Sequence, residues 1–597
     1  MSAPRLDPHS VFDPTQPRTR RLSLRWDIDF ERRVIRGSVR LELAAAARGG
    51  PLDLDTRGLT IGSVTGPAGA AIPYRLGDAD PVLGQRLRLD LPPGTEAVTI
   101  AYETSPEASA LQWLQPRQTA GRRQPFLFSQ CQAIHARSVV PVQDSPAARI
   151  TYDAEVTVPD PLNVVMSAAP HGVRPGPRSG TRTFRFDMPQ PIPPYLLALA
   201  AGEIVARDLS SRSRVYAEPE MIEAAAWEFA EIEAMLAAAE RLFGPYPWER
   251  YDMLVLPPSF PYGGMENPRM TFLTPTLLAG DRSLVDVVAH ELAHSWTGNL
   301  VTNASADHFW LNEGTTVYAE RRIQEALHGE ESAALAWSIG RKALEADLER
   351  LAPHPEWTRL RQHLEGVDPD EAFSTVPYEK GARLWALLER TVGRERLDAA
   401  IRAYIERFRF TSITTEDWLR FVQEQLPGAA EAIGVADWLD GAGLPSNEPR
   451  FTSAAESGRQ ALAARVAAGA RPSDEMVGWT TAETLVFLNA LPRPLDAGTC
   501  AWLDRSLGLT ASGNHEILVV WLAIAIASDY EPSRQRVREV LTNVGRMKYL
   551  RPLYTALARN PRTLSLGREI LAEAAPGYHP LSRRVASTIL DEAGDKP

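Results

Sequence analysis

Apolar and polar residues alternate along the first third of the chain. The segments Val39–Leu43, Leu87–Leu91 and Glu155–Val158 place an apolar side chain at every second position. This period puts one face of a strand on a core and the other toward water. Because proline and glycine turns separate these short segments, residues 1–202 are predicted to form an antiparallel β saddle or sandwich.

The pattern becomes helical after about residue 203. Ile222–Phe243 is rich in alanine and glutamate with helical spacing, and Leu284–Leu300 and Phe309–Leu327 repeat that spacing. These segments predict a mainly helical second domain over residues 203–442. Residues 443–452 contain turn formers and no periodicity, which is typical of a linker.

The last part of the chain is predicted to be helical throughout. Thr481–Leu491, His515–Ser528 and Ser533–Val544 are apolar-periodic segments separated by turns. Helix pairs of this kind stack into an α-solenoid, although no strict sequence repeat is present. We therefore expect a multidomain α+β protein whose helical third domain covers residues 453–597.

Charge and cysteine content narrow the class of partner. The chain of 597 residues carries a net charge of −11, which argues against a nucleic-acid partner. The longest apolar run, Ile517–Ala527, is too short to cross a bilayer. Two distant cysteines and the lack of a signal-peptide pattern in residues 1–13 favour a reducing compartment. We expect a cytoplasmic protein without a membrane partner.

One short motif carries metal chemistry. His290 and His294 are four positions apart within an apolar helical pattern, so both imidazoles lie on one helix face. Glu291, beside the first histidine, can reach a metal-bound water without binding the metal. Two surface histidines on an amphipathic helix are the alternative interpretation of this motif taken alone.

A glutamate in the next predicted helix completes the set of ligands. Glu313 follows His294 after eighteen intervening residues. A catalytic zinc ion takes three protein ligands and keeps one open position for water. Glu320, two helical turns further on, is either a hydrogen-bond partner of a ligating imidazole or a solvated charge. Iron oxygenases also use two histidines and one carboxylate, but oxygen chemistry does not need a base at Glu291.

A glycine-rich segment lies upstream of the metal motif. Gly263 and Gly264 precede Met265, Glu266 and Asn267. This is either a turn before a strand, or a bare strand edge that a substrate backbone can approach. In the second interpretation, Glu266 offers its carboxylate to a free α-ammonium group.

Together these motifs resemble those of the gluzincin zinc aminopeptidase family, which includes aminopeptidase N and leukotriene A(4) hydrolase. Three further segments are most similar to the leukotriene A(4) hydrolase branch: Phe128–His135, Val376–Gly381 and Gly545–Leu553. The resemblance extends over nearly the whole chain. It implies a thermolysin-like catalytic domain, one zinc ion per chain, and removal of the first residue from short peptides.

The resemblance also implies individual roles. Glu266 would hold the substrate's amino terminus with the help of Gln130, and Gln132 and the glycine segment Gly263–Met265 would line the same site. Tyr378 would stabilise the oxyanion, a role that requires a phenol donor. Without the family match, Tyr378 would be interpreted as a packing residue.

Three more residues match positions that bind the ends of a substrate. Arg546 and Lys548 would receive the peptide's C-terminal carboxylate; taken alone, they would be solvated basic residues. Asp370 matches an aspartate linked to preference for a basic first residue, and its alternative is a helix cap before Glu371. We expect the chain to be a monomer that acts on short peptides.

Two other functions are compatible with the motifs. One is hydrolysis of a lipid epoxide at the same metal, and the other is peptide binding without catalysis. The second would require a lost ligand, base or tyrosine, and none is lost. Against the first, Phe373 and Ala306 stand where the branch has a tyrosine and a tryptophan, and losing a tryptophan removes much of a pocket wall.

Overall fold

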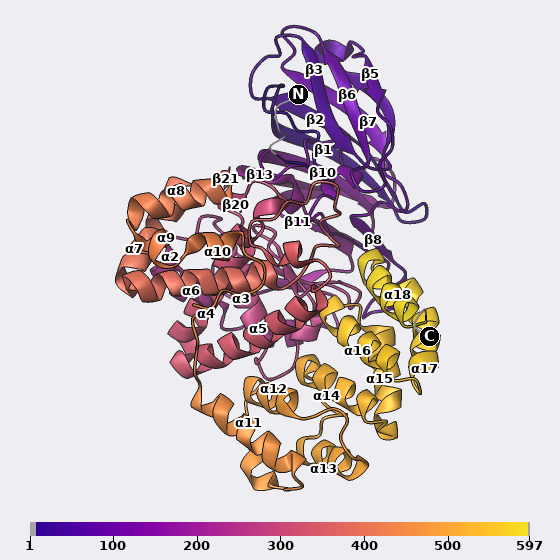
Figure 1. Ribbon diagram of the computed structural model, residues 1–597. Coiled ribbons are helices and arrows are strands. Elements are labelled where there is room, and N and C mark those ends of the chain that lie inside the picture. Colours follow the sequence, from indigo (N-terminus) through magenta and orange to yellow (C-terminus); the bar gives the residue numbers. More distant parts are fainter. Residues whose placement is uncertain (1–6, 595–597) are drawn as a thin grey trace.

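The computed structural model describes residues 7–594, which form three domains in chain order (Figure 1). Strands dominate up to Gly202, a mainly helical part with small sheets follows, and residues 454–594 contain helices without strands. The predicted fold class is confirmed. The domain boundaries at 202, 442 and 452 each fall between elements and stay predictions, because one apolar core continues from the β domain into the catalytic domain.

A seven-stranded sheet forms most of the β domain. Its order is β12-β13-β10-β1-β2-β7-β4. In β1, Leu22, Leu24, Trp26 and Ile28 are buried and alternate with exposed or half-buried residues, as the period of two predicts. The strands are β1 (Thr19–Asp29), β2 (Val34–Leu43), β4 (Thr60–Thr65), β7 (Ala97–Glu103), β10 (Ile150–Pro159), β12 (Ala169–Pro175) and β13 (Thr181–Ile192).

One strand pair in this sheet departs from the antiparallel expectation. β1 and β10 run parallel, whereas the other neighbours run antiparallel. Parallel neighbours need a long connection, and the many residues between these two strands supply it. Those residues include the smaller sheet of β3 (Gly50–Thr56), β6 (Gln85–Leu91) and β5 (Tyr74–Leu76).

A four-stranded sheet joins the β domain to the catalytic domain. Its order is β11 (Asn163–Met166), β14 (Leu199–Gly202), β9 (Phe126–Ser129) and β8 (Leu111–Leu114). Phe128 in β9 packs edge-on against Phe260 of the catalytic domain at a ring distance of 5.8 Å. Because β9 ends at Ser129, it delivers Gln130 and Gln132 to that interface.

The catalytic domain opens with a five-stranded sheet whose edge strand carries the glycine motif. The order is β15 (Val205–Asp208), β16 (Arg214–Ala217), β17 (Met253–Val255), β19 (Thr271–Leu273) and β18 (Gly264–Met265). A two-stranded parallel pair, β20 (Val301–Asn303) and β21 (Thr411–Ile413), lies further along.

Two of the predicted helices are shorter than their sequence patterns. Residues 222–243 form α1 (Ile222–Glu228) and α2 (Ile232–Phe243), because the chain turns at the buried Phe229. The segment predicted over 284–300 forms only α3 (Asp286–Ala293). The chain then turns through Gly298, whose φ of 133° is open to glycine but not to a helix, and enters β20.

The remaining catalytic helices follow α3 along the chain. α4 (Trp310–His328) matches the predicted helix over 309–327 and packs against α3. The others are α5 (Glu330–Arg350), α6 (Gly381–Val392), α7 (Arg394–Arg407), α8 (Thr415–Gln425), α9 (Ala429–Ala432) and α10 (Val435–Leu439). Both α5 and α6 pack against α4.

The third domain consists of paired helices with their own apolar core. The apolar run at 517–527 lies in α14, where Leu518, Trp521 and Ile524 are fully buried. No helix within residues 7–594 combines the length and apolar character needed to cross a membrane. The helices are α11 (Ala454–Ala467), α12 (Thr481–Ala490), α13 (Ala497–Leu507), α14 (His515–Ala527), α15 (Arg534–Asn543), α16 (Met547–Arg559), α17 (Leu564–Ala574) and α18 (Pro580–Gly594).

The predicted linker at 443–452 is irregular but anchored. Glu448 is buried and accepts hydrogen bonds from Arg341 and Arg383, each at 3.0 Å. Phe451 stacks on Trp337 with ring centres 4.3 Å apart. Because a buried carboxylate is costly without its cations, these contacts hold the linker against the catalytic domain.

Candidate metal centre

Three donor atoms converge between α3 and α4. The Nε2 atoms of His290 and His294 are 3.1 Å apart, and each lies 3.4 Å from Oε2 of Glu313. The helical spacing of four explains the histidine pair, and the packing of α4 on α3 brings in Glu313. The predicted ligands therefore lie within reach of one ion.

This donor set fits zinc. A point equidistant from the three atoms lies about 1.9 Å from each, close to the usual zinc–nitrogen and zinc–oxygen distances. Oε2 of Glu313 is buried and has no hydrogen-bond partner, which leaves it free to bind a cation. Burial raises the pKa of Glu313, but His294 and His290 lower it to about 2 when their rings are protonated, and a bound cation would favour the ionised carboxylate in the same way.

Second hydrogen bonds orient both imidazoles. Nδ1 of His290 lies 3.1 Å from Oε2 of Glu320, and Nδ1 of His294 lies 2.9 Å from the carbonyl oxygen of Thr297. With Nδ1 donating in each ring, Nε2 keeps its lone pair for the metal. Of the two interpretations of Glu320, the structure supports the imidazole partner.

Glu320 begins a buried row of alternating charges. Arg321 pairs with Glu320 and, at 3.1 Å, with Glu379, which receives a 2.7 Å hydrogen bond from Arg383. Arg383 also binds Glu448 of the linker. Each of these desolvated charges needs both neighbours, so the row connects a metal ligand's partner with the linker between domains.

Glu291 lies beside the metal ligands. It is 6% exposed, and one of its carboxylate oxygens lies within 4.8 Å of a carboxylate oxygen of Glu266 and of a ring nitrogen of His294. Burial raises the pKa of Glu291 to about 7. A base is most effective when its pKa is near the working pH, so this carboxylate suits proton transfer to and from a water.

Glu266 is a buried carboxylate beside the metal ligand His294. Nε2 of Gln132 donates a 3.4 Å hydrogen bond to its Oε1, and within residues 7–594 neither a lysine nor an arginine pairs with it. Burial raises its pKa. A ligand with a positive charge would stabilise the ionised form.

At each of the two glycines of the motif, a different neighbouring side chain leaves no space for a Cβ atom. A Cβ atom on Gly264 would lie 2.3 Å from Oε1 of Glu291, and one on Gly263 would lie 2.7 Å from Nη2 of Arg546. Both distances are shorter than any tolerated contact, so a side chain at either position would displace a site residue. Of the two interpretations of this segment, the edge strand β18 supports the bare strand edge.

Tyr378 faces the metal ligands from a single π-helical turn, Val376–Lys380. Such turns occur often at functional sites. Its ring is half-buried and stacks on His290 at 6.1 Å between ring centres. Burial, followed by the charge of Glu313, raises the pKa of Tyr378 well above its ordinary value, so the phenol keeps its proton.

Arg546 and Lys548 lie at the start of α16 and share one partner. Arg546 is 4% exposed, whereas the side chain of Lys548 is 59% exposed. Both donate to Glu516, at 3.3 and 2.9 Å. Arg546 is thus a buried residue and not a solvated one, and it lies against Gly263.

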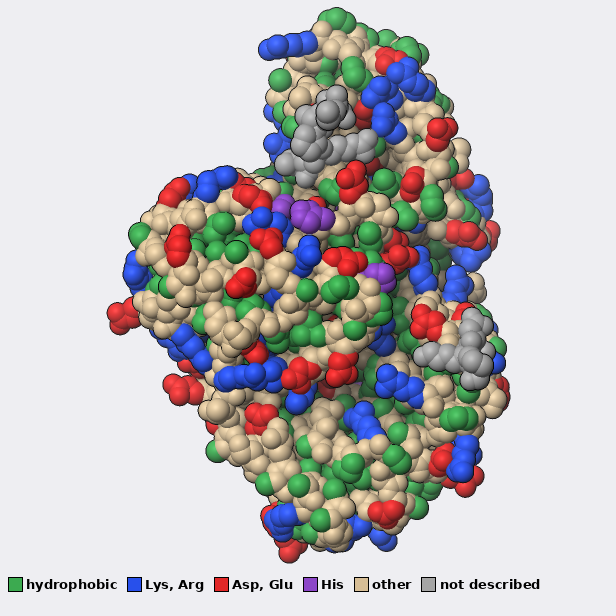
Figure 2. All heavy atoms as spheres, in the orientation of Figure 1, with side chains coloured by type: hydrophobic (Ala, Val, Ile, Leu, Met, Phe, Trp, Pro, Cys, Tyr) green, Lys and Arg blue, Asp and Glu red, His purple; other side chains and the backbone are tan. Residues whose placement is uncertain are grey.

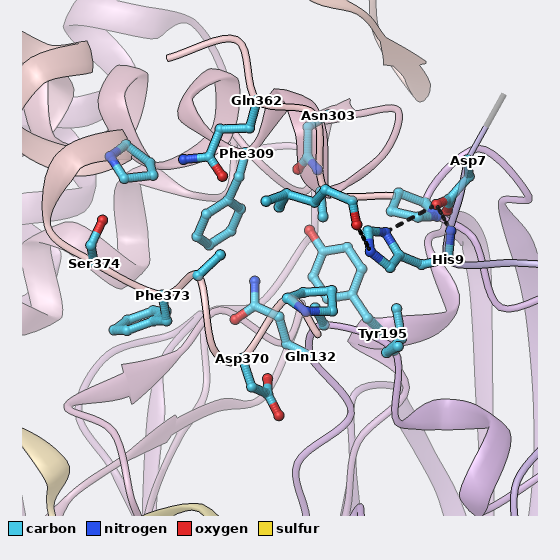
Figure 3. A pocket seen from close by; sticks show the side chains of 18 of the residues that line it. Asp7, His9, Gln132, Tyr195, Asn303, Phe309, Gln362, Asp370, Phe373 and Ser374 are labelled. Carbon is cyan, nitrogen blue, oxygen red and sulfur yellow. Dashed lines mark hydrogen bonds and ion pairs between the residues drawn. The ribbon is translucent and has the colours of Figure 1, made fainter. Parts of the chain in front are cut away.

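Asp370 lines an apolar cavity (Figure 3). No helix begins at Glu371, so the helix-cap alternative is wrong. The carboxylate instead lies 3.1 Å from Nε2 of His135. Burial raises the pKa of Asp370, but the nearby His135 acts in the opposite direction, and the resulting pKa is below its usual range.

The same cavity contains the two positions that differ from the family branch. Its lining is mainly apolar, with a few polar side chains such as Gln132 and Asp370. Ala306, Phe309 and Phe373 line it, and the two phenylalanines contact Tyr378 with ring centres about 6 Å apart. The metal ligands are outside this lining, so the cavity adjoins the centre through Tyr378.

Sequence reasoning missed two partners of the site residues. Of the two glutamines predicted for the site, Gln132 lies against Glu266. Gln130 donates to the sulfur of Met265, and its buried Oε1 has no hydrogen-bond partner within residues 7–594. His135 was visible within the Phe128–His135 match. Glu516 carries no local signal, because only the approach of α14 to α16 brings it to Arg546.

Family models match three consecutive parts of the chain. They are described as the Peptidase M1 N-terminal domain over residues 16–196, the Peptidase family M1 domain over 227–438, and Leukotriene A4 hydrolase, C-terminal, over 479–590. The three predicted domains therefore each contain one match.

Full-length relatives and solved structures are similar over nearly the whole chain. Leucine aminopeptidase 2 of Yarrowia lipolytica is 39% identical, over 94% of this chain and 90% of the relative. Leukotriene A-4 hydrolase of Xenopus laevis is 38% identical, over 92% and 93%. The structure of yeast leukotriene A4 hydrolase in complex with bestatin superposes with a TM-score of 0.91 at 32% identity, covering 98% of both chains.

Metal content and turnover separate the ligands from the base. We expect His294→Ala to lose zinc, because two ligands bind it far more weakly than three. Glu291→Gln should keep zinc but lower hydrolytic turnover by about 10² to 10⁴, the usual contribution of a positioned base. His308→Ala, a half-buried histidine that bonds Thr415 instead, is the matched control. Near-normal turnover in Glu291→Gln would contradict its assignment as the base.

Proposed function

The chain belongs to peptidase family M1 and is a zinc-dependent metallo-aminopeptidase, and on that premise we propose which of its residues bind and cleave a peptide. His290, His294 and Glu313 hold the zinc ion, Glu291 is the base, and Tyr378 stabilises the oxyanion. Glu266 anchors the free amino terminus with Gln132 beside it, and Arg546 with Lys548 receives the carboxylate end.

The observation that carries this assignment is the unpaired carboxylate of Glu266. It is buried beside the metal ligands, and within residues 7–594 its side chain accepts a hydrogen bond from the neutral amide of Gln132. The α-ammonium of a peptide would supply the missing positive charge. The unpartnered Oε1 of Gln130, next to Met265, can accept from the same ammonium. This anchor places the scissile bond after the first residue, which is the property of an aminopeptidase.

The ends of the site give the substrate a direction. Glu266 follows the last residue of β18, whereas Arg546 lies against Gly263 before its first residue. A peptide with its ammonium at Glu266 and its carboxylate at Arg546 therefore runs antiparallel to this edge strand. The span from residue 263 to 266 is roughly 10 Å in an extended chain, about three residues, which favours short peptides.

The chain's own residues carry out the proton transfers. When bound, zinc acidifies a water and polarises the scissile carbonyl. Glu291 takes the proton of that water and later passes it to the leaving amine. The phenol of Tyr378, protonated because its pKa is raised, donates a hydrogen bond to the developing oxyanion. The absence of a side chain at Gly264 leaves the space that the carboxylate of Glu291 occupies.

We also propose that the protein acts in the cytoplasm as a monomer. Both cysteines, Cys131 and Cys500, are free and buried, which suits a reducing compartment. Every residue assigned to the site comes from one chain. On the face shown in Figure 2, acidic and basic side chains are interspersed, which does not favour a nucleic-acid partner.

The ammonium anchor is tested with blocked substrates. We expect Glu266→Ala to lower kcat/KM for free tripeptides by about 10² or more, since the ammonium then loses its buried counter-charge. N-acetylated tripeptides should not be cleaved by the wild type. Glu266→Asp, which keeps the charge, should retain more activity than the alanine variant. Efficient cleavage of an acetylated peptide would rule out the exopeptidase assignment.

We further propose that Asp370 favours a basic first residue. It lies in the lining of the cavity beside the anchor, and its lowered pKa keeps it ionised. Asp370→Asn should lower the ratio of kcat/KM for Arg-starting over Ala-starting tripeptides by about tenfold, one charge interaction. Asp368→Asn is the matched control, because Asp368 pairs with Arg584 and is absent from the described lining. An unchanged ratio would exclude Asp370 from the pocket.

Hydrolysis of a lipid epoxide is the second candidate, since one relative is named a leukotriene A-4 hydrolase. Ala306 and Phe373 both line the cavity, where they change the wall and remove a hydroxyl. We expect little or no dihydroxy acid when the purified protein is incubated with leukotriene A4 and the products are separated by chromatography. Stereospecific product at a rate comparable to peptide turnover would overturn this prediction.

A further inference from the structure

Glu516 occupies the first turn of α14 and binds both cations of the carboxylate end. Its Oε1 accepts from Nη1 of Arg546 at 3.3 Å, from the hydroxyl of Tyr549 at 3.0 Å and from Nζ of Lys548 at 2.9 Å. Its Oε2 lies 2.8 Å from the same ammonium. One carboxylate of the chain therefore already binds both cations that would receive the carboxylate of a peptide.

These contacts hold Arg546 by a single nitrogen. Nη1 donates to Thr276, Glu516 and Tyr549, and the guanidinium lies over the ring of Tyr549 at 4.7 Å. Nε is buried without a partner, and Nη2 is the atom that lies against Gly263. Within residues 7–594, the Nε–Nη2 edge is thus oriented and has no hydrogen-bond partner, and such an edge can bind a carboxylate through two parallel hydrogen bonds.

The backbone fixes that edge relative to β18. The amide of Met547 donates to the carbonyl oxygen of Pro261 at 2.9 Å, and the amide of Gly545 donates to that of Pro258 at 2.8 Å. Arg546 belongs to the third domain, so these bonds hold its position against the glycine segment of the catalytic domain. The site for the last residue is therefore built before a peptide arrives.

The charges of these side chains indicate which ligand the site accepts. Arg546 and Lys548 contribute two positive charges. Burial raises the pKa of Glu516, but Lys548 and Arg546 lower it to about 2, so its negative charge persists at neutral pH. Together with Glu516 these two cations carry a net charge of +1, and the nearby carboxyl group of Asp286 also interacts with Arg546, so little positive charge is left for more than one carboxylate.

We propose that Glu516 is a specificity-determining residue for the last residue of the peptide. It restricts the carboxylate end of the site to peptides whose last residue carries its C-terminal carboxylate as its one negative charge. The inference rests on the proposed function and adds the class of last residue. A peptide ending in aspartate or glutamate would bring a second carboxylate next to Glu516, and like charges in a partly buried site repel strongly. Neutral last residues are accepted, and acidic ones are disfavoured.

The test compares two tripeptides and one neutral substrate. Arg-Ala-Ala and Arg-Ala-Glu differ by one carboxylate, and an arginyl-amide dye lacks the C-terminal carboxylate. In Glu516→Gln, which keeps an acceptor oxygen but loses the charge, kcat/KM for Arg-Ala-Glu relative to Arg-Ala-Ala should rise about tenfold. The change should lie in KM, with kcat nearly constant, because no reacting atom is touched.

Two control variants isolate the charge at this position. Glu516→Asp keeps the charge and should keep the wild-type ratio. Glu569→Gln changes the net charge of the chain equally, but Glu569 is exposed and pairs with Arg538. Its ratio should therefore match the wild type. Zinc content and thermal midpoint, measured for each variant, show that the comparison is made on folded, loaded enzyme.

The outcomes separate this inference from the proposed function. An unchanged or lower ratio in Glu516→Gln overturns the inference, and so does an equal rise in Glu569→Gln. If Glu516→Gln does not fold, the wild type decides. A wild-type ratio of kcat/KM for Arg-Ala-Glu over Arg-Ala-Ala near one overturns the inference. A ratio far below one supports it if Glu516→Asp preserves the ratio and added salt weakens the discrimination. Turnover of the dye by the wild type tests the proposed function alone, since that substrate does not reach Arg546.

Discussion

The site depends on how closely one strand approaches two charged side chains. Gly263 lies against Arg546, and Gly264 lies against Glu291, with no space for a Cβ atom at either position. Two adjacent residues therefore fix the position of the base relative to the guanidinium. The edge strand β18 between the ends of the site also sets the direction in which a peptide can lie. A methyl group here would shift the base or the guanidinium, with consequences for binding and for chemistry.

All three domains contribute residues to this site. The β domain supplies Gln130 and Gln132 after β9, the catalytic domain supplies the ligands and β18, and the third domain supplies Arg546. Because many of these groups are charged and buried, each needs a partner that is itself held in place. The row from Glu320 to Glu448 serves the metal side in this way, and Glu516 serves the carboxylate side.

Much of the site could be predicted because its geometry is local. The spacing of four between His290 and His294 places two imidazoles on one helix face in any environment. The glycine motif and the period-two strands are local patterns of the same kind. The order of domains followed from changes in period along the chain. The family resemblance then related segments far apart in sequence, such as Tyr378 and Arg546, to the same centre.

The sequence by itself determined the elements, the metal ligands and the chemistry that they support. Tertiary structure alone decided where helices end, as at Gly298, and which buried charges meet. Gln132 reaches Glu266, His135 holds Asp370, and Glu516 holds Arg546 only because separate elements pack together. No periodicity records such pairs, since they depend on the relative position of distant segments. The physical reason is that burial makes an unpaired charge costly, and its partner is supplied by whichever element the fold brings next to it.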